Sequence, residues 1–432
     1  MTSFGGLVIF QHLFERLGFW QRLRQCCAHI VPNHHYSHST ILRCLIIHLL
    51  LGYRRLREME FYRHDPLVLR VAGLRQLPSV PTVSRMLNEF DPQSVGDLQK
   101  ANRELVLDRL ATERFSTVTL DFDGSVLSTR RHAEGTAVGF NKQKKGARSY
   151  YPLFCVVPQS GQVFDLLHRS GNVHDSNGSC AFLRSCAKSV RDRMPNTRVE
   201  ARLDSAFFSD EMVTLLESLD IEYTISVPFE RFVILKKVIE ERSRWSEVPG
   251  SAGKRHYFEW KWKPESWTKK RRFLFVRQTV AVQQKEPIQL DLFTPVAEGY
   301  EFKVIVTNKK GTAGRIARFH EGRGSQEKVY GELKSQAQMD YVPCRRLVAN
   351  QIYLLSTILV HNLGRELQMQ AAPPARSTVI KRTAAWVFEE LNTLRRTIIQ
   401  RAGRLTRPQG RITLTLPKIP VLQNAILRFL PT

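Results

Sequence analysis

The stretch Phe115-Ser-Thr-Val-Thr-Leu-Asp-Phe-Asp123-Gly124 decides how this chain folds, because its polar and apolar residues alternate with a period of two. One face of the resulting β-strand would carry Val118, Leu120 and Phe122, and the other Thr117, Thr119, Asp121 and Asp123. The pattern predicts a half-buried strand with both aspartates on one side, the second at its end.

Further strands and helices are expected downstream in a regular order. The pattern predicts a hairpin over 150–157 and 162–168, a helix over 175–190, a strand over 198–203 ending at Asp204, a helix over 209–219 and a strand over 221–227. Three strands, a helix, a strand, a helix and a strand form the order of a ribonuclease H-like α/β core. The fold class expected is therefore α/β, with this core at its centre.

The remaining segments divide the chain into five parts. We expect an N-terminal helical DNA-binding domain at residues 1–110, the first part of the core at 111–228, a β-rich insertion at 229–300, the second part of the core with a glutamate-bearing helix at 301–372, and a basic C-terminal region at 373–432. A short helix expected over 79–90 could enter a DNA groove or simply pack inside a helical bundle.

Composition limits the possible functions. The 432 residues carry a formal net charge of +25, and the isoelectric point is near 10.1. Such a balance favours a polyanionic partner, DNA or RNA. We expect no membrane span, because no apolar stretch reaches roughly 20 residues, and no secretion signal. Seven cysteines, mostly in apolar contexts, fit a reduced cytoplasmic protein.

Three acids are the candidate catalytic and metal-binding residues. Asp123 and Asp204 each end an apolar strand, and Glu327 lies within a predicted helix. Carboxylates from separate elements can hold two divalent cations against a phosphodiester. In a regular helix, Arg323 and Lys334 would share a face with Glu327 and could contact flanking phosphates. The alternative is a solvated helix face with ion pairs, and strand-end aspartates are common.

Several motifs resemble those of a known family. The spacing His320-x2-Arg323-x3-Glu327-x6-Lys334 is similar to the Tyr-Arg-Glu-Lys signature of bacterial insertion-sequence transposases of the DDE type. Other segments resemble the insertion sequence 1380 family: Gly52-Tyr53, Asp65-Pro66, Pro81-Thr82-Val-Ser-Arg85, Leu120-Asp-Phe-Asp123-Gly, Arg202-Leu-Asp204-Ser, Ala349-Asn350-Gln351 and His361-Asn362-Leu363. The resemblance covers nearly the whole chain.

This resemblance implies a catalytic triad of Asp123, Asp204 and Glu327 with two Mg²⁺ or Mn²⁺ ions. It implies a β insertion within a ribonuclease H-like core, and a homodimer that bridges two transposon ends. His320 replaces the signature tyrosine, which is expected to contact a phosphate, as histidine can also do. Asp121 is a second-choice metal ligand, because it shares a strand face with Asp123.

The function expected is that of a DDE transposase. By the resemblance, it binds the terminal inverted repeats of its own insertion sequence and catalyses cleavage and strand transfer, with double-stranded DNA as transposon end and as target. We expect His320, Arg323 and Lys334 to contact that DNA, and the protein to act in the bacterial cytoplasm at the nucleoid. The alternatives are a transposase-derived DNA-binding protein without catalysis and a stand-alone DNA nuclease.

Overall fold

The computed structural model describes residues 1–31, 35–129, 132–139, 141, 144–174, 176–249, 251–279, 299–376 and 379–430. Residues 280–298 of the expected insertion and residue 175 of an expected helix lie outside this range. No helix within it is long and apolar enough to cross a membrane.

The N-terminal part is helical. Its elements are α1 (Leu7–Arg16), α2 (Phe19–Gln25), α3 (His38–Leu50), η1 (Leu56–Tyr62), α4 (Pro66–Ala72), α5 (Val80–Leu87) and α6 (Pro92–Glu113). Polar side chains cap α3, α4, α5 and α6, and at the start of α5 the Ser79 side chain accepts a hydrogen bond from the Thr82 backbone. Helix α5 buries Val83, Met86 and Leu87 and exposes Ser84 and Arg85, so it packs on one face and remains open on the other.

A nine-stranded mixed sheet forms the centre of the molecule. Its strands, in spatial order, are β6 (Gln162–Leu167), β5 (Leu153–Val157), β1 (Thr117–Gly124), β7 (Arg198–Leu203), β8 (Glu222–Ser226), β12 (Tyr300–Thr307), β11 (Arg271–Thr279), β10 (Arg255–Trp262) and β9 (Ser246–Glu247). Strands β1, β7 and β8 are parallel, and the other pairs are antiparallel. The strand expected around Asp123 is therefore an interior strand of this sheet, between β5 and β7.

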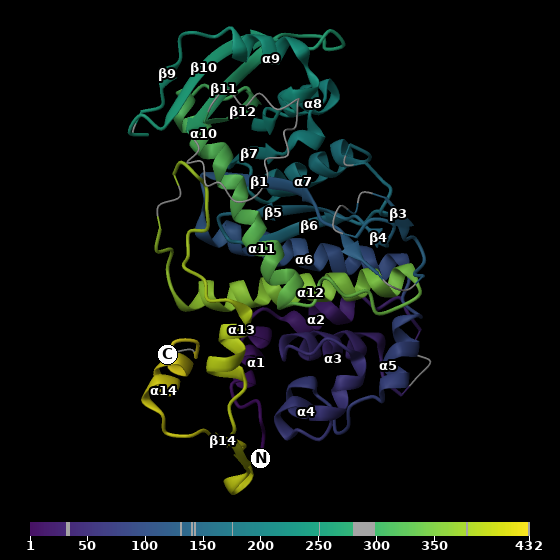
Figure 1. The fold of residues 1–432 in the computed structure, drawn as a ribbon. Helices are drawn as coiled ribbons and strands as arrows, with labels where there is room; N and C mark the ends of the chain where they lie inside the picture. The colour runs from purple at the N-terminus through teal and green to yellow at the C-terminus, as the bar shows by residue number, and fades with distance from the viewer. Residues whose placement is uncertain are drawn as a thin grey trace.

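The expected β insertion continues this same sheet. Strand β11 pairs with β12 over its whole length, and β12 pairs with β8 of the core, so β9 to β11 extend one sheet rather than form another (Figure 1). Helix α9 (Val233–Glu240) precedes these strands. Aromatic side chains bury their shared face, where the Phe258 and Phe275 rings stack with centroids 4.3 Å apart.

Helices cover both faces of the central strands. Helices α7 (Ser179–Arg193) and α8 (Asp210–Ser218) cover one face, where Phe122 packs against Phe182. Helix α6 runs along the edge strand β6 and contributes apolar residues to the cores on both faces. The long helix α12 (Leu347–Ala371) covers β5 and β6 on the other face, and Figure 1 shows it between the sheet and the N-terminal helices. Helix α10 (Ala313–Glu321), the turn η4 (Gly322–Gly324) and helix α11 (Ser325–Ser335) run along that face.

Smaller elements complete the chain. A three-stranded sheet contains β2 (Leu127–Ser128), β3 (Ala137–Val138) and β4 (Arg148–Tyr150), short turns are η2 (Ser205–Phe207) and η3 (Phe229–Arg231), and the C-terminal region contains α13 (Leu391–Leu394), η5 (Arg395–Ile399), β13 (Arg404–Thr406), η6 (Pro408–Gly410), β14 (Thr413–Thr415) and α14 (Pro420–Leu427). This region packs against the N-terminus, where Thr2 bridges Gly403.

One arginine of the basic C-terminal region, Arg395, lies inside the protein rather than on its surface. Its side chain is only 3% exposed and donates hydrogen bonds to the carbonyl oxygens of Leu49, Leu50 and Gln336. Burial lowers the pKa of this guanidinium to about 10. Arg395 therefore caps the end of α3 inside the protein, because the C-terminal region folds back onto the N-terminal helices.

Candidate active site

Two aspartates lie side by side at one edge of the sheet. The parallel register pairs Phe122 of β1 with Leu203 of β7, so Asp123 and Asp204 follow at the ends of neighbouring strands. The Asp204 carboxylate also accepts a hydrogen bond of 3.0 Å from the Ala206 backbone at the start of η2. Both side chains are partly exposed. The sheet therefore presents two carboxylates from adjacent strand ends to one partly open region.

The start of α11 reaches the same strand end. Arg323 in η4 places Nη1 3.4 Å from Oδ2 of Asp123, and Gln326 donates from Nε2 to that oxygen over 2.9 Å. Gln326 is 1% exposed, whereas Glu327, the next residue in the first turn of α11, is exposed. The helix that carries Glu327 is thus tied to Asp123, but the Glu327 side chain lies in solvent.

The three predicted acids do not form one cluster in this arrangement. Across the described ranges, no three or more His, Cys, Asp or Glu side chains are placed so that they could hold a metal ion. The structure brings Asp123 and Asp204 to adjacent strand ends, whereas the Glu327 side chain is exposed and does not join them. The turn η4 also interrupts the regular helix assumed for Arg323, Glu327 and Lys334, so helical spacing alone does not place Arg323.

Two buried polar atoms lie on the helix that is tied to Asp123. Within the described residues, Oε1 of Gln326 and the hydroxyl of Tyr330 are buried without a hydrogen-bond partner. Burial raises the pKa of Tyr330 well above its ordinary value, and the nearby charge of Asp123 raises it further. An amide oxygen beside carboxylates is a donor set that suits Mg²⁺. Sequence analysis missed Gln326, and its place beside Glu327 in the motif was the available signal.

Asp121, the second-choice ligand, has a different partner. Its carboxylate is fully buried and forms a two-pronged ion pair with Arg202, with Nε to Oδ1 at 2.6 Å and Nη2 to Oδ2 at 2.7 Å. Burial raises the pKa of Asp121, although the charge of Arg202 lowers it. Both carboxylate oxygens of Asp121 bind the Arg202 guanidinium. Asp123 is therefore the better placed of the two aspartates to bind a metal.

His320 lies inside the protein rather than at a DNA-facing surface. It is 1% exposed, its Nε2 lies 2.8 Å from the Ser226 hydroxyl, and its Nδ1 lies 2.9 Å from that of Thr224. Burial lowers its pKa well below the ordinary value. This placement gives no support to the expected phosphate contact, because α10 turns this residue onto β8.

Lys334 borders an open cavity of about 970 Å³ between the N-terminal helices and the core. Burial lowers the pKa of Lys334, while Asp340 and Asp123 oppose this effect. The cationic side chains that line the cavity are those of Arg54, Arg55, Arg57, Lys144 and Lys334. Helix α5 contributes Val80 and Ser84, so the helix that could either enter a DNA groove or pack in a bundle borders this basic cavity.

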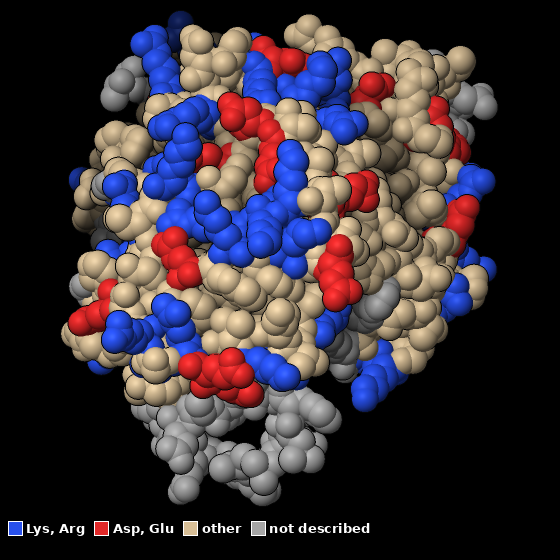
Figure 2. Space-filling model, turned by 90° about the horizontal axis from the view of Figure 1, so that it is seen from above, with Lys and Arg blue, Asp and Glu red and all other residues tan. Residues whose placement is uncertain are grey.

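A second basic surface covers the extended end of the sheet. Figure 2, which looks down on the region of β9 to β12, shows Lys and Arg gathered across the middle of this face with Asp and Glu among them. The exposed cations of residues 229–279 include Lys237, Arg242, Arg244, Lys254, Lys261, Lys269 and Lys270. The same segment also exposes Glu230, Glu240, Glu241, Glu247, Glu259 and Glu265, so positive and negative charges are interspersed on this part of the surface.

Comparison with protein families identifies the class of protein. Residues 1–431 match the model of the transposase DDE domain group 1 family. The chain belongs to this family of transposases. Membership in the insertion sequence 1380 family is not established by this match. No curated protein shows a significant match to the chain.

Two solved transposase complexes show low structural similarity to this chain. One is piggyBac transposase in a synaptic complex with hairpin DNA, at 11% identity and a TM-score of 0.43, covering 99% of this chain and 85% of that chain. The other is Mos1 transposase in a paired-end complex with the left transposon end, at 12% identity and a TM-score of 0.20, covering 45% and 60%. Similarity at these scores carries no weight for mechanism.

Proposed function

We propose that this protein is a DDE transposase of the insertion sequence 1380 type. It binds the terminal inverted repeats of its own element and catalyses metal-dependent DNA cleavage and strand transfer. The observation that carries the proposal is the meeting of Asp123 and Asp204 on adjacent strand ends with the start of the Glu327 helix, which Arg323 and Gln326 tie to Asp123. Membership in a transposase family supports the same conclusion.

The arrangement of the central strands supports a ribonuclease H-like core. Strands β6, β5 and β1 form an antiparallel meander, and β7 and β8 add on the other side of β1 in parallel. Parallel neighbours need a crossover, and α7 and α8 supply it on one face. This topology places the ends of β1 and β7 together, where a two-carboxylate site can form.

Asp123, Asp204 and Glu327 are the residues that would hold two Mg²⁺ or Mn²⁺ ions. Such ions activate an attacking water or 3′-hydroxyl and stabilise the leaving oxygen of an in-line displacement. Glu327 must turn its side chain toward the strand ends to complete this set. Gln326 and Arg323 orient Asp123 through its Oδ2 atom. The donor types fit these hard cations, since all three acids offer carboxylate oxygens.

The basic cavity beside Lys334 is the proposed path of the DNA. Its cations can bind phosphates, and Arg323 and Lys334 border the strand ends from one side. Phosphate contacts of this kind position a duplex and leave sequence recognition to other groups, such as the exposed face of α5. Two transposon ends each need a reactive site, so we propose that two copies of the chain act together.

One observation favours a second candidate, a transposase-derived DNA-binding protein without catalysis. Glu327 is exposed and, in the described part of the chain, no three-acid cluster is present. This protein would retain the basic cavity and bind element ends without cutting them. A nuclease would cut the DNA without joining it.

An assay of cleavage and joining separates the three functions. The wild-type protein would be incubated with a labelled duplex that carries an inverted repeat and its flank, a target plasmid, and Mg²⁺ or Mn²⁺. A transposase cleaves at the element boundary and joins that end to the plasmid. Cleavage without joining would indicate a nuclease, and a gel shift without cleavage in either metal would indicate the DNA-binding protein.

A further inference from the structure

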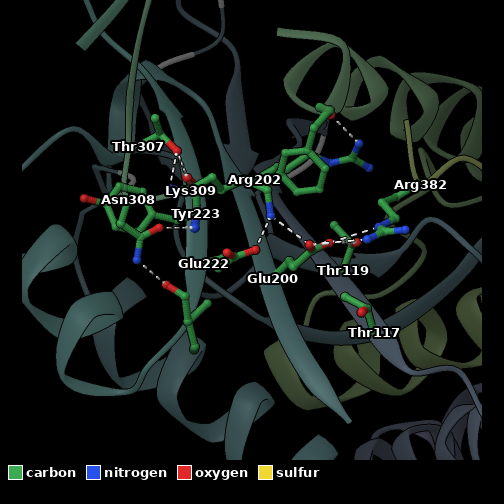
Figure 3. A network of polar contacts seen from close by, with 12 residues as sticks. Thr117, Thr119, Glu200, Arg202, Glu222, Tyr223, Thr307, Asn308, Lys309 and Arg382 are labelled. Atoms are coloured by element: carbon green, nitrogen blue, oxygen red, sulfur yellow. Dashed lines mark hydrogen bonds and ion pairs between the residues drawn. The ribbon is translucent and has the colours of Figure 1, made fainter. Parts of the chain in front are cut away.

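The face of the sheet that α10 covers carries buried polar and charged side chains. On β1 and β7 this face carries Thr119, Asp121, Glu200 and Arg202, all buried. Helix α10 and a segment that we call the C-terminal strap, residues 379–386, contact this face. Figure 3 shows Thr119, Glu200 and Arg202 of this group within a network of polar contacts. Buried charge of this kind requires partners, and the partners come from distant segments.

Arg202 is the centre of this network. Its side chain is completely buried, and its guanidinium binds both carboxylate oxygens of Asp121. Its Nη1 atom also donates to the carbonyl oxygen of Phe319 over 2.8 Å and to that of Lys381 over 2.7 Å. One side chain thus joins β7 to β1, to the end of α10 and to the C-terminal strap.

The position of Arg202 relates it directly to the two strand-end aspartates. Asp121 and Arg202 are opposite each other in the β1 and β7 register, and each precedes an aspartate, Asp123 or Asp204, by two residues. Residues two apart in a strand point to the same face. The ion pair of Asp121 with Arg202 therefore lies on the same sheet face as the two carboxylates, two residues further from the strand ends, and joins the two strands that bear them.

The Arg202 guanidinium also contacts the chain just before α11, the helix that carries Glu327. Phe319 contributes one of the last carbonyls of α10, and Gly322 immediately afterwards begins the η4 turn that carries Arg323. A Cβ atom on Gly322 would collide with the Lys381 carbonyl oxygen and with Nη1 of Arg202. The backbone at 322 therefore packs directly against Arg202, and α11 starts from that point.

A second ion cluster holds the strap in place. Glu200 accepts from Nζ of Lys309 over 2.7 Å and from Nε of Arg382 over 3.1 Å, and Figure 3 shows the two cations on opposite sides of it. The strap is held further by the Ala385 backbone, which donates to the Gln159 carbonyl over 2.8 Å. The strap carbonyl that binds Arg202 is thus fixed independently of Arg202.

A buried ion pair contributes little net stability, because desolvation offsets the attraction, and an apolar replacement of similar volume is often tolerated. The two-pronged geometry of a guanidinium and a carboxylate, in contrast, specifies relative position closely. We propose that Arg202, through Asp121, is a positioning residue: it aligns Asp123, Asp204 and the start of α11 so that they form one metal site. This inference rests on the proposed function.

The test replaces the pair by apolar residues in the variant Asp121→Leu/Arg202→Met. Free Mn²⁺ would be measured by electron paramagnetic resonance in titrations of the full-length protein, alongside thermal melting, a DNA gel shift and cleavage at saturating Mn²⁺. Removing groups that orient metal ligands typically lowers metal affinity or activity about 10- to 100-fold. We expect a Mn²⁺ affinity at least about tenfold weaker, with melting and the gel shift close to wild type.

The matched control is a second buried two-pronged pair, Arg109 with Glu366, which joins α6 to α12 away from the strand ends. The variant Arg109→Met/Glu366→Leu should keep the wild-type Mn²⁺ affinity. If the Asp121→Leu/Arg202→Met protein does not fold, Arg202→Lys replaces it, because lysine keeps the charge and cannot make the paired contacts.

The outcomes separate this inference from the proposed function. Wild-type Mn²⁺ affinity and cleavage in a folded Arg202 variant would overturn the positioning role. An equal loss of Mn²⁺ affinity in the Arg109 control would also overturn the positioning role, because loss of any buried ion pair would then explain the weaker Mn²⁺ binding. The proposed function fails separately, if wild-type protein binds no Mn²⁺ and Asp123→Ala changes nothing.

Discussion

The two faces of strand β1 differ sharply, although they belong to the same eight residues. Val118, Leu120 and Phe122 face an apolar core shared with α7 and α8. On the other face, Asp121 is bound by Arg202, and Asp123 meets Gln326 and Arg323 at the strand end. The apolar face gains stability from burial, whereas the polar face orients charged groups at a net stability gain close to zero.

The comparison teaches where changes should act. Altering the apolar face should change the free energy of unfolding and leave the chemistry of the folded fraction intact. Altering the strand-end acids should change the chemistry and leave folding intact, because they are partly exposed. The predictions below test this division, beginning with the largest effect.

Replacing Asp204 by alanine should abolish strand cleavage. A bound metal supplies several kcal/mol of transition-state stabilisation, so losing a ligand should slow cleavage by about a thousandfold or more. End binding should stay nearly intact, because affinity comes mainly from phosphate contacts. A single-turnover nicking assay beside a gel shift would show this, and equal losses in both would assign Asp204 a structural role instead.

Replacing Phe122 by alanine should act on stability. Its ring is 1% exposed and meets Phe182 edge to face at 5.8 Å. Emptying such a site costs about 3–5 kcal/mol of unfolding free energy, which urea unfolding would measure. Phe61, 77% exposed, is the control, and Phe61→Ala should cost less than about 0.5 kcal/mol. A normal unfolding curve for Phe122→Ala would contradict the assignment of stability to this face.

Replacing Lys334 by alanine should weaken DNA binding without changing its sequence preference. Each phosphate neutralised contributes about 0.9 to the slope of log affinity against log salt concentration, so the slope should fall by about that amount. Lys188→Ala is the control, because this exposed lysine on α7 pairs with Asp192. Fluorescence anisotropy at several salt concentrations measures both slopes. An unchanged slope for Lys334→Ala would remove this residue from the DNA path.

His320 of α10, which packs on the polar side of the sheet, should give the stability of the fold a pH dependence that the apolar core does not. Burial holds the pKa of His320 well below its ordinary value of 6.5, so His320 stays neutral in the folded protein while the unfolded chain takes up a proton below pH 6.5. Stability from this residue is fully present above pH 6.5 and is lost as the pH falls toward the folded-state pKa. Urea unfolding from pH 7.5 to 5 should show a shallower decline for His320→Gln, and parallel curves would refute this.

The sequence predicted the features that depend on local pattern. The alternation around Asp123 identified β1 and placed both aspartates on one side, and the short helix expected over 79–90 corresponds to α5. The two strand-end aspartates could be paired because parallel strands end at the same edge. These inferences need no knowledge of distant contacts.

Features that depend on distant contacts could not be predicted. The burial of His320 follows from the packing of α10 on β8, and that of Arg395 from the return of the C-terminal region to α3. The ion pair of Arg202 with Asp121 depends on strand register. A basic composition is the same whether an arginine caps a helix or faces a phosphate, so composition alone could not place Arg395.

The most direct test of the central claim concerns Glu327, whose side chain lies in solvent although its helix is tied to Asp123. The variant Glu327→Gln keeps size and polarity and removes only the charge. The account predicts normal melting and DNA binding, with single-turnover cleavage slowed by about a thousandfold or more in both Mg²⁺ and Mn²⁺. Cleavage by Glu327→Gln at the wild-type rate would contradict the proposal that these three acids form one metal site.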